Sequence, residues 1–462
     1  MDLKKKYSKY KFKYLNLHEK YKNEAIINTS DIQNNLNNNI NPNNKEIYEI
    51  KIDQTNKPNQ EKSLPIDIPS NQENIISNTS STSSSSNTLN SQNKGPEDPR
   101  IFIFSGKKYL LYNRLNHKKE RHMYYRKIGL QDKPDDIDTE ICWNVSKKFE
   151  KNWGPFELNN KLYFLYSLSP LKIINYNEEH SKCNFIYDEP VEVFNFLENL
   201  YSGLHLHIRN SSPLSKFITG DKKTYYLGIG HSVLDFGEDK QSLLKYFMRK
   251  QNYPFNPSDL KYFTEDFGKI YYTFFYTLEC LPDNKYKIKS ITPMFQFENK
   301  YDHTIEFACD LSIVDNDIVY IGYGVDDNRA VLEKMYLKDI LALMIEVNLI
   351  DKKNYDIDSY FLPKLNTYLC NKITQYNLDM TETIKKYIPD QTIFNLGIEH
   401  DHGDEFLICA RCYNGNIRTW DGSNSIILLR VKLSSENFIL GKEPKILSSW
   451  EINKNLQTNN KF

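Results

Sequence analysis

Charged and amide side chains recur at one kind of place in this chain, directly before or after short runs of β-forming residues. At the starts of the first runs stand Glu97-Asp98-Pro99-Arg100, Lys151-Asn152-Trp153, Ser211-Ser212, Glu306 and Asn395. At the ends of the second runs stand Asn113-Arg114, Ser167, His231, Asp326-Asp327 and Arg411. If the runs are equivalent strands of a repeated unit, these side chains converge on one pocket.

Carboxylates, cations and an indole at equivalent strand ends suit a sugar ligand. Carboxylates accept hydrogen bonds from hydroxyls, and an indole face stacks on the C–H face of a sugar ring. A carboxylic acid can also protonate a glycosidic oxygen. Structural interpretations of the same residues stay open, because Asp98 can cap a turn before Pro99 and Glu306 can pair with an arginine of a neighbouring strand.

Five copies of one hairpin are predicted to position these side chains. Each copy has a short β run, a turn of Gly, Asn, Asp or Ser, and a second run rich in Tyr, Leu and Ile. The copies span 100–114, 155–169, 216–233, 309–326 and 393–413.

Further strands are predicted behind these hairpins, for example at 270–279 and 425–433, so each repeat holds about four strands. Repeats of this size predict an all-β fold, a five-bladed β-propeller. A sandwich also has many short strands, but it does not restart one hairpin five times. Helical pieces at 338–347 and 379–386 are expected outside the blades, as connections.

The chain ahead of the propeller has a different composition. Apolar and aromatic residues between Leu3 and Tyr21 alternate at spacings of four and three among lysines, which predicts a short amphipathic helix in 1–25. Such a helix can self-associate, bind an anionic surface or stay solvated. The Asn-rich and Ser-rich stretch 26–95 is predicted to be a disordered linker, because it offers few residues for a core. The propeller is assigned to 96–450, and 451–462 to a disordered tail.

Several motifs resemble those of the five-bladed glycosidase superfamily, and within it the β-mannoside phosphorylases and mannosidases. Glu97-Asp98-Pro99-Arg100 resembles that family's E-D-P-R, and 323–327 (Y-G-V-D-D) resembles its Y-G-A-A-D. Shorter likenesses lie at Lys151-Asn152, at 227–231 ending in His231, and at Phe394-Asn395 with Arg411. The last of these blades comes first in that family, which implies a circular permutation.

The resemblance implies a carbohydrate-active protein with a pocket at the propeller axis. Asp98 would be the proton donor, with Glu306 and Asp327 positioning hydroxyls or water. Trp153 would form a stacking wall, and the substrate-binding residues would be Arg100, Asn152, His231, Asn395 and Arg411. The segment 166–170 lacks the arginine that family members use for phosphate, which counts against phosphorolysis. A non-catalytic glycan-binding or scaffold propeller, or an accessory domain of glycan assembly, is the alternative.

The composition of the chain limits the kinds of partner and the location that we expect. Lys+Arg and Asp+Glu are both 60, so no whole-chain field steers the protein to nucleic acid. No apolar run is long enough to span a membrane, and no secretory signal is visible. Seven Cys favour a reducing compartment, so a cytoplasmic location is expected. The Asn-rich tracts and Lys/Tyr-rich start resemble proteins of giant DNA viruses of the mimivirus kind, which would place the chain in host cytoplasm or the virion.

No cofactor or metal is expected. Cys409 and Cys412 lie on one predicted strand, where two residues three apart point to opposite faces. The pairs His205/His207 and His400/His402 lie near predicted loops and are interpreted as solvated side chains.

Overall fold

The computed structural model describes residues 95–116, 118–129, 133–135, 137–143, 149–177, 182–199, 205–235, 269–297, 305–350, 376–415, 422–433 and 445–453. The predicted N-terminal helix and the linker up to residue 94 lie outside these residues, as do 454–462 of the predicted tail.

The described strands form five sheets, each built largely from consecutive antiparallel strands. The first blade contains β1 (Glu97–Phe104), β2 (Lys107–Leu115), β3 (Arg121–Ile128) and β4 (Thr139–Glu140). The second contains β6 (Gly154–Leu158), β7 (Lys161–Ser167), β8 (Leu171–Asn177) and β9 (Lys182–Glu189), and β5 (Cys142–Trp143) pairs with β9 in parallel. The third contains β10 (His205–Asn210), β11 (Ser215–Ile218), β12 (Thr224–Asp235), β13 (Lys269–Leu281), β14 (Lys285–Ile291) and β18 (Ile345–Glu346).

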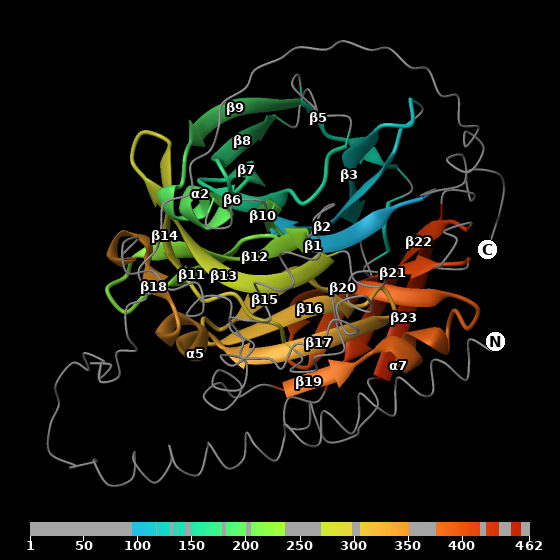
Figure 1. Cartoon of the computed structure of the whole chain (residues 1–462). Helices are drawn as coiled ribbons and strands as arrows, with labels where there is room; N and C mark the ends of the chain where they lie inside the picture. Colours follow the sequence, from blue (N-terminus) through green and yellow to red (C-terminus); the bar gives the residue numbers. More distant parts are fainter. Residues whose placement is uncertain are drawn as a thin grey trace, which may run out of the picture. The chain divides into compact units, whose positions relative to one another are not determined.

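The fourth blade contains β15 (Glu306–Val314), β16 (Ile318–Val325), β17 (Arg329–Tyr336) and β19 (Tyr376–Asp379), and the fifth contains β20 (Thr392–His402), β21 (Glu405–Tyr413), β22 (Asn424–Lys432) and β23 (Lys445–Asn453). Short helices lie between strands: α2 (Glu192–Asn199), α5 (Leu337–Ala342), the 3-10 turn η2 (Val347–Leu349) and α7 (Thr381–Lys385). This is the predicted five-bladed propeller. In Figure 1 the first strands β1, β15 and β20 lie toward the middle, with β9 and β19 at the rim.

The ring is held by apolar side chains packed between neighbouring blades. Both faces of a blade are covered, so strands such as β16 are buried along nearly their whole length. Five clusters of buried residues each fill one gap between adjacent blades. The cluster that joins the last blade to the first includes Ile101, Tyr112, Leu407 and Leu428. The ring therefore closes by side-chain packing between blades that are distant in sequence.

Three details differ from the sequence-based expectation. The inner strand of the third blade begins at His205, because β10 and β11 both pair with β12, and Ser211 and Ser212 lie in the interruption between them. The predicted helices are shorter, at Leu337–Ala342 and Thr381–Lys385, and α2 was not predicted. The last strand runs to Asn453, beyond the predicted boundary at 450, because it completes the sheet beside β22.

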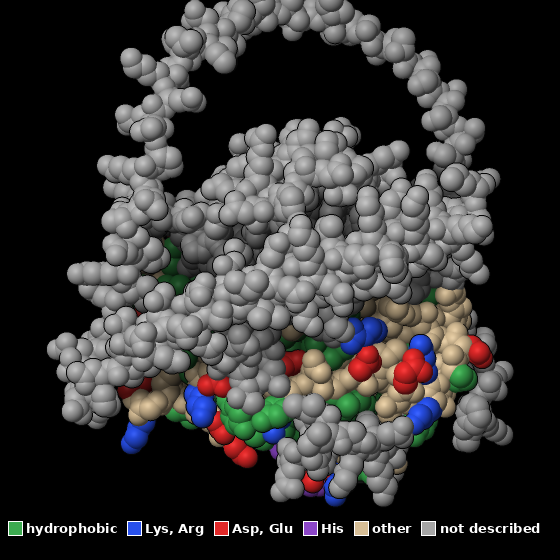
Figure 2. Space-filling model, turned by 60° about the horizontal axis from the view of Figure 1, so that its bottom comes forward, with side chains coloured by type: hydrophobic (Ala, Val, Ile, Leu, Met, Phe, Trp, Pro, Cys, Tyr) green, Lys and Arg blue, Asp and Glu red, His purple; other side chains and the backbone are tan. Residues whose placement is uncertain are grey.

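The surface carries charges of both signs. Figure 2 shows Lys and Arg side chains interspersed with Asp and Glu over the described part of one face. This agrees with the equal numbers of basic and acidic residues in the chain.

Glu399 lies on β20 and is partly buried. Its carboxyl accepts a hydrogen bond from Ser312 Oγ at 3.1 Å. Burial raises the pKa of Glu399 to about 8, although Ser312 and Lys108 act in the opposite direction. The folded protein therefore keeps a proton on Glu399 at neutral pH, whereas the unfolded chain loses it near pH 4.5.

We predict that the substitution Glu399→Gln makes stability less dependent on pH. Between pH 4.5 and about 8 the folded state binds the extra proton, so the wild-type protein loses stability as pH rises. Measured against the wild type, the variant should be about 1–2 kcal/mol better off at pH 7 than at pH 5, which is less than the full shift because the side chain is partly exposed. Thermal unfolding at the two pH values measures this, with Glu405→Gln as the control for loss of one carboxylate. An equal change at both pH values contradicts it.

Candidate functional site

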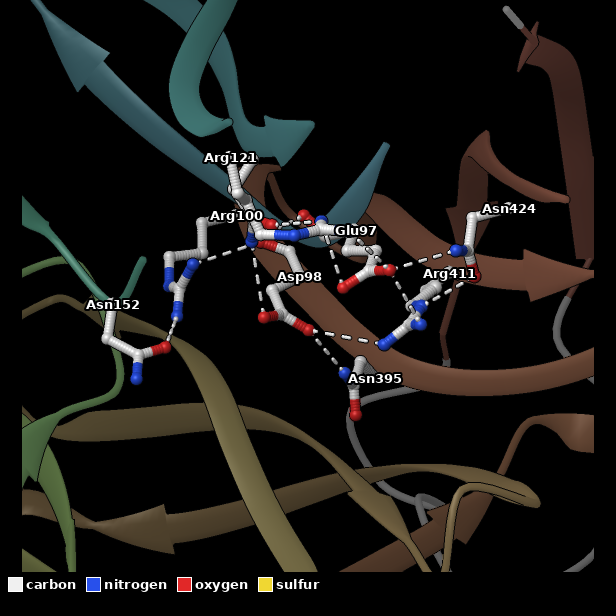
Figure 3. A network of polar contacts seen from close by, with 9 residues as sticks. Glu97, Asp98, Arg100, Arg121, Asn152, Asn395, Arg411 and Asn424 are labelled. Atoms are coloured by element: carbon white, nitrogen blue, oxygen red, sulfur yellow. Dashed lines mark hydrogen bonds and ion pairs between the residues drawn. The ribbon is translucent and has the colours of Figure 1, made fainter. Parts of the chain in front are cut away.

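Asp98 lies near the start of β1 and is held by residues of three other strands. Its Oδ1 accepts a hydrogen bond from Asn395 Nδ2 at 2.8 Å, and its Oδ2 accepts one from Asn113 Nδ2 at 3.2 Å. Arg411 Nη1 lies 3.6 Å from Oδ1. Asp98, Asn395 and Arg411, three of the side chains expected to converge, are thus in contact, as Figure 3 shows.

Glu97, the residue before it, links the first and last blades. It forms ion pairs with Arg121 at 3.0 Å and with Arg411 at 3.2 Å. Asn424 Nδ2 donates to the same carboxylate at 3.0 Å, while Asn424 Oδ1 accepts from Arg411 Nε at 2.8 Å. Since these groups are nearly fully buried, their mutual pairing compensates the loss of hydration.

Arg100 turns to the other side of Asp98, toward the second and third blades. Its guanidinium donates to the Ser211 carbonyl at 2.6 Å, to the Asp98 carbonyl at 3.0 Å and to Asn152 Oδ1 at 3.3 Å. The side chain is fully buried. Arg100 therefore ties three blades together beneath the Asp98 carboxylate, and it offers a ligand little open surface.

The backbone explains why Asp and Asn occupy these places. Asp98, Asn152, Asn395 and Asp327 have φ of 51°, 66°, 55° and 50°, in the left-handed region. Asn and Asp tolerate this region better than other residues with a β-carbon. Backbones in such conformations concentrate at functional sites. We call the residues Asp98, Asn152, His231, Asp327, Asn395 and Arg411 the axial mouth.

Asp98 and Asp327 have opposite pKa shifts. Burial acts to raise the pKa of Asp98, but Arg411, Arg100 and Lys151 together lower it below its ordinary value. Burial raises the pKa of Asp327, and the charges of Asp98 and Glu97 add to this against the effect of Arg411. No hydrogen bond to the Asp327 carboxyl is found among the described residues. Asp98 is therefore a fixed carboxylate, whereas Asp327 more readily holds a proton.

Two cations near the axial mouth have no partner among the residues that the structure describes. Lys151 and Arg209 are both exposed, and neither makes a hydrogen bond or ion pair within the described part of the chain. Desolvation nevertheless lowers the pKa of Lys151, with Asp98 opposing and Arg209 contributing. The arrangement leaves positive charge available to an anion.

His231 is buried beside these cations. Its Nδ1 lies 2.6 Å from Ser211 Oγ, and its ring stacks on that of Tyr271 with the ring centroids 5.8 Å apart. Burial lowers the pKa of His231 well below its usual range, and Arg209, Lys151 and Arg100 act in the same direction. The imidazole is therefore neutral, and it can exchange hydrogen bonds but carries no charge to a ligand.

Two predicted site residues are enclosed by the fold. Trp153 is 1% exposed and packs on Phe164 and Tyr166, with its Nε1 donating to Glu150 Oε2 at 3.2 Å. Its faces are covered, so Trp153 has no open surface for stacking on a sugar. Glu306 is 0% exposed and accepts a hydrogen bond from Phe297 N at 2.5 Å. This contact joins the first residue of β15 to Phe297 in the third blade's connection.

Several residues of the network were not proposed from the sequence as site residues. Arg121 and Asn424 stand at the starts of outer strands, and Arg209 pairs in register with His231. Asp310 had a visible signal, an isolated carboxylate inside the apolar strand β15. Arg121 and Asn424 had none, because their partners come from other blades.

Two other features lie away from the axial mouth. A cavity of about 530 Å³ opens between outer strands of the second and third blades, lined by residues such as Tyr187, Tyr286 and Val347. Asp401, His402 and Glu405 place possible metal ligands within 4.8 Å of one another. Arg430 already pairs with both of these carboxylates, at 2.5 and 2.6 Å. Among the described residues, no helix is long and apolar enough to cross a membrane.

Comparisons with known proteins give partial similarities. No family model matches the chain. A stretch of 115 residues is 30% identical to β-mannosyltransferase 1 of the yeast Komagataella phaffii, covering 21% of this chain and only 17% of the yeast protein.

Among solved structures, similar ones include a thermostable family-43 glycoside hydrolase, with a TM-score of 0.39, 10% identity and coverage of 77% of this chain and 93% of that one. An α-L-arabinofuranosidase from Podospora anserina has a TM-score of 0.37 and 9% identity, with coverage of 75% and 93%. An endo-1,4-β-xylanase from Bacteroides thetaiotaomicron has a TM-score of 0.35 and 8% identity, with coverage of 78% and 96%.

Proposed function

We propose that this protein acts on glycosidic linkages at the axial mouth. Asp98 accepts hydrogen bonds from sugar hydroxyls, and Asp327 donates the proton to the leaving oxygen. The observation that carries this proposal is the pair of neighbouring carboxyl groups whose pKa values are shifted in opposite directions. Such a pair is how one site separates an acid from a carboxylate. The proton-donor role expected for Asp98 thus passes to Asp327 in this proposal.

The ligand we propose is a mannose derivative with an anionic group, such as a sugar phosphate. Lys151 lies near Asp98, and Arg209 lies near Lys151 and His231. Neither cation has a hydrogen bond or ion pair with another described residue, and such cations favour phosphate oxygens. The mannosyl part is supported by the sequence likeness to the yeast β-mannosyltransferase. The missing arginine near Ser167 counts against phosphorolysis, so transfer of a mannosyl group from a phosphate-bearing donor to an acceptor hydroxyl is the reaction we favour. The C1–O bond to the phosphate breaks as Asp327 protonates the leaving oxygen, the bond to the acceptor oxygen forms, and the proton of the acceptor returns to Asp327.

A non-catalytic glycan-binding protein is the second candidate. It is favoured by the depth of the network around Asp98, in which arginines and amides already hold the carboxylate. A site built for binding alone needs the fixed hydrogen-bond acceptor but not the protonated Asp327. Turnover therefore distinguishes the two functions, whereas binding does not.

Binding of mannose and of mannose 1-phosphate, measured by titration calorimetry, tests the proposal. We expect the phosphate ester to bind more tightly, and Lys151→Ala or Arg209→Ala to weaken it about tenfold each, the scale of one charge-assisted hydrogen bond. Affinity for mannose itself should change little. Lys161→Ala, at the opposite end of the same blade, is the matched control and should have no effect.

Each outcome has a meaning. If wild-type protein binds neither ligand, the proposed function is wrong. If both bind equally and the two alanine variants behave like Lys161→Ala, the anionic part of the proposal is wrong. Binding without turnover of any mannosyl donor in the presence of β-mannoside acceptors supports the non-catalytic alternative.

A further inference from the structure

Three inner strands carry an irregularity at the same level of the ring. The register shifts between Glu97 and Arg100 on β1, between Ala308 and Asp310 on β15, and between Phe394 and Leu396 on β20. Bulges re-aim side chains and are typical of strands beside functional sites. On β1 and β20 the bulged residues, Asp98 and Asn395, are hydrogen-bonded to each other.

On β15, the residue that follows the irregularity is Asp310, and its carboxylate contacts both of the other two bulged strands, β1 and β20. Asp310 is 0% exposed. Its Oδ2 accepts hydrogen bonds from Ile101 N at 2.8 Å and from Ile398 N at 3.1 Å, and its Oδ1 accepts from Leu311 N at 2.9 Å. Ile101 and Ile398 each lie three residues after the bulged residue of their own strand. One carboxylate thus fixes β1 and β20 at matching positions.

Gly397 shows how closely this carboxylate is enclosed. A β-carbon at this position would lie 2.6 Å from Cys409 Sγ, 2.7 Å from Asp310 Oδ2 and 3.1 Å from the Pro99 carbonyl. The first two distances are too short for a real side chain to fit without displacing its neighbours. Only glycine therefore allows β20 to approach Asp310 and the backbone next to Asp98.

We propose that Asp310 is the positioning residue of the axial mouth. It sets the spacing of Asp98 and Asn395 by holding the backbones of β1 and β20 on one carboxylate. It does not touch a ligand itself, because it is buried beneath them. This inference rests on the proposed function only for its effect on ligand binding, whereas its effect on the bulges can be measured without a ligand.

The test compares Asp310→Asn with Ser215→Ala in the full chain. Asparagine replaces one acceptor oxygen with an NH2 donor. Leu311 N loses its acceptor if Oδ1 is replaced, and Ile101 N and Ile398 N lose theirs if Oδ2 is replaced. Ser215 Oγ donates to the carbonyl of Leu311 at 3.1 Å, so its loss also removes a hydrogen bond between blades, but not one to β1 or β20. Hydrogen exchange followed by mass spectrometry reports on peptides containing Asp98 and Asn395, and calorimetry with mannose 1-phosphate reports on the site.

Asp310→Asn should speed exchange at both bulges and weaken mannose 1-phosphate binding about tenfold or more. Ser215→Ala should leave both unchanged. Slow exchange at both bulges in a folded Asp310→Asn protein would overturn the inference. If that variant does not fold, Gly397→Ala replaces it with the same expectations, because the added methyl presses on the Asp310 carboxylate as well as on Cys409 Sγ. If wild-type protein binds no sugar phosphate, the proposed function fails while the exchange data still decide this inference.

Discussion

Replacing Arg411 with methionine is expected to lower the free energy of unfolding by about 3–5 kcal/mol. Arg411 is 7% exposed and faces both Glu97 and Asp98, and its Nε also bonds Asn424. Methionine keeps much of the volume but leaves two buried carboxylates with one cation fewer. Because these contacts join the last blade to the first, their loss weakens closure of the ring.

Urea unfolding followed by circular dichroism measures this effect. Arg430→Met is the matched control on the same blade, since Arg430 also pairs with two carboxylates, Asp401 and Glu405. Those side chains are all more than 20% exposed, so the control should lose about 1 kcal/mol or less. Equal losses in the two variants would show that the buried network contributes no more than a surface ion pair.

Replacing Asp327 with asparagine is expected to reduce mannosyl turnover by about 10²–10⁴-fold, the usual contribution of a general acid. Burial raises the pKa of Asp327, so the wild-type reaction should slow as pH rises through that pKa and the acid loses its proton. The variant should lose this limb of the pH profile. KM should change little, because the sugar is held by the neighbouring carboxylate.

Two matched substitutions separate acid catalysis from binding. Asp326→Asn changes the adjacent residue, whose Oδ1 accepts a hydrogen bond from Ile305 N at 3.0 Å, and asparagine keeps that acceptor. It should retain turnover and the limb of the pH profile, with the limb moved to lower pH because the Asp326 charge helps to raise the pKa of Asp327. Asp98→Asn should act mainly on KM, through loss of a charged acceptor held by Asn395 and Arg411. If Asp327→Asn retains full turnover while Asp98→Asn abolishes kcat, the proton donor is Asp98, as the sequence resemblance implied.

The sequence by itself determined the repeat and much of the mouth. Alternating apolar residues broken by turns such as Ser105-Gly106 and Asp315-Asn316 predicted hairpins that the structure contains, since β periodicity and turn chemistry are local properties. Asp98 and Asn395 were predicted to meet because equivalent strands of a closed ring end at the same place. The interrupted inner strand of the third blade was missed, because Ser211 and Ser212 interrupt the local pattern although β10 and β11 share one partner.

Only the tertiary structure decided the state of each group. Asp98 and Asp327 are chemically identical in the sequence, yet Arg411, Arg100 and Lys151 lower the pKa of one while burial raises that of the other. Trp153 was expected to be an open platform and is enclosed between the first two blades. Charge and burial depend on neighbours hundreds of residues away, such as Arg411 beside Asp98, and no spacing along one chain encodes those distances.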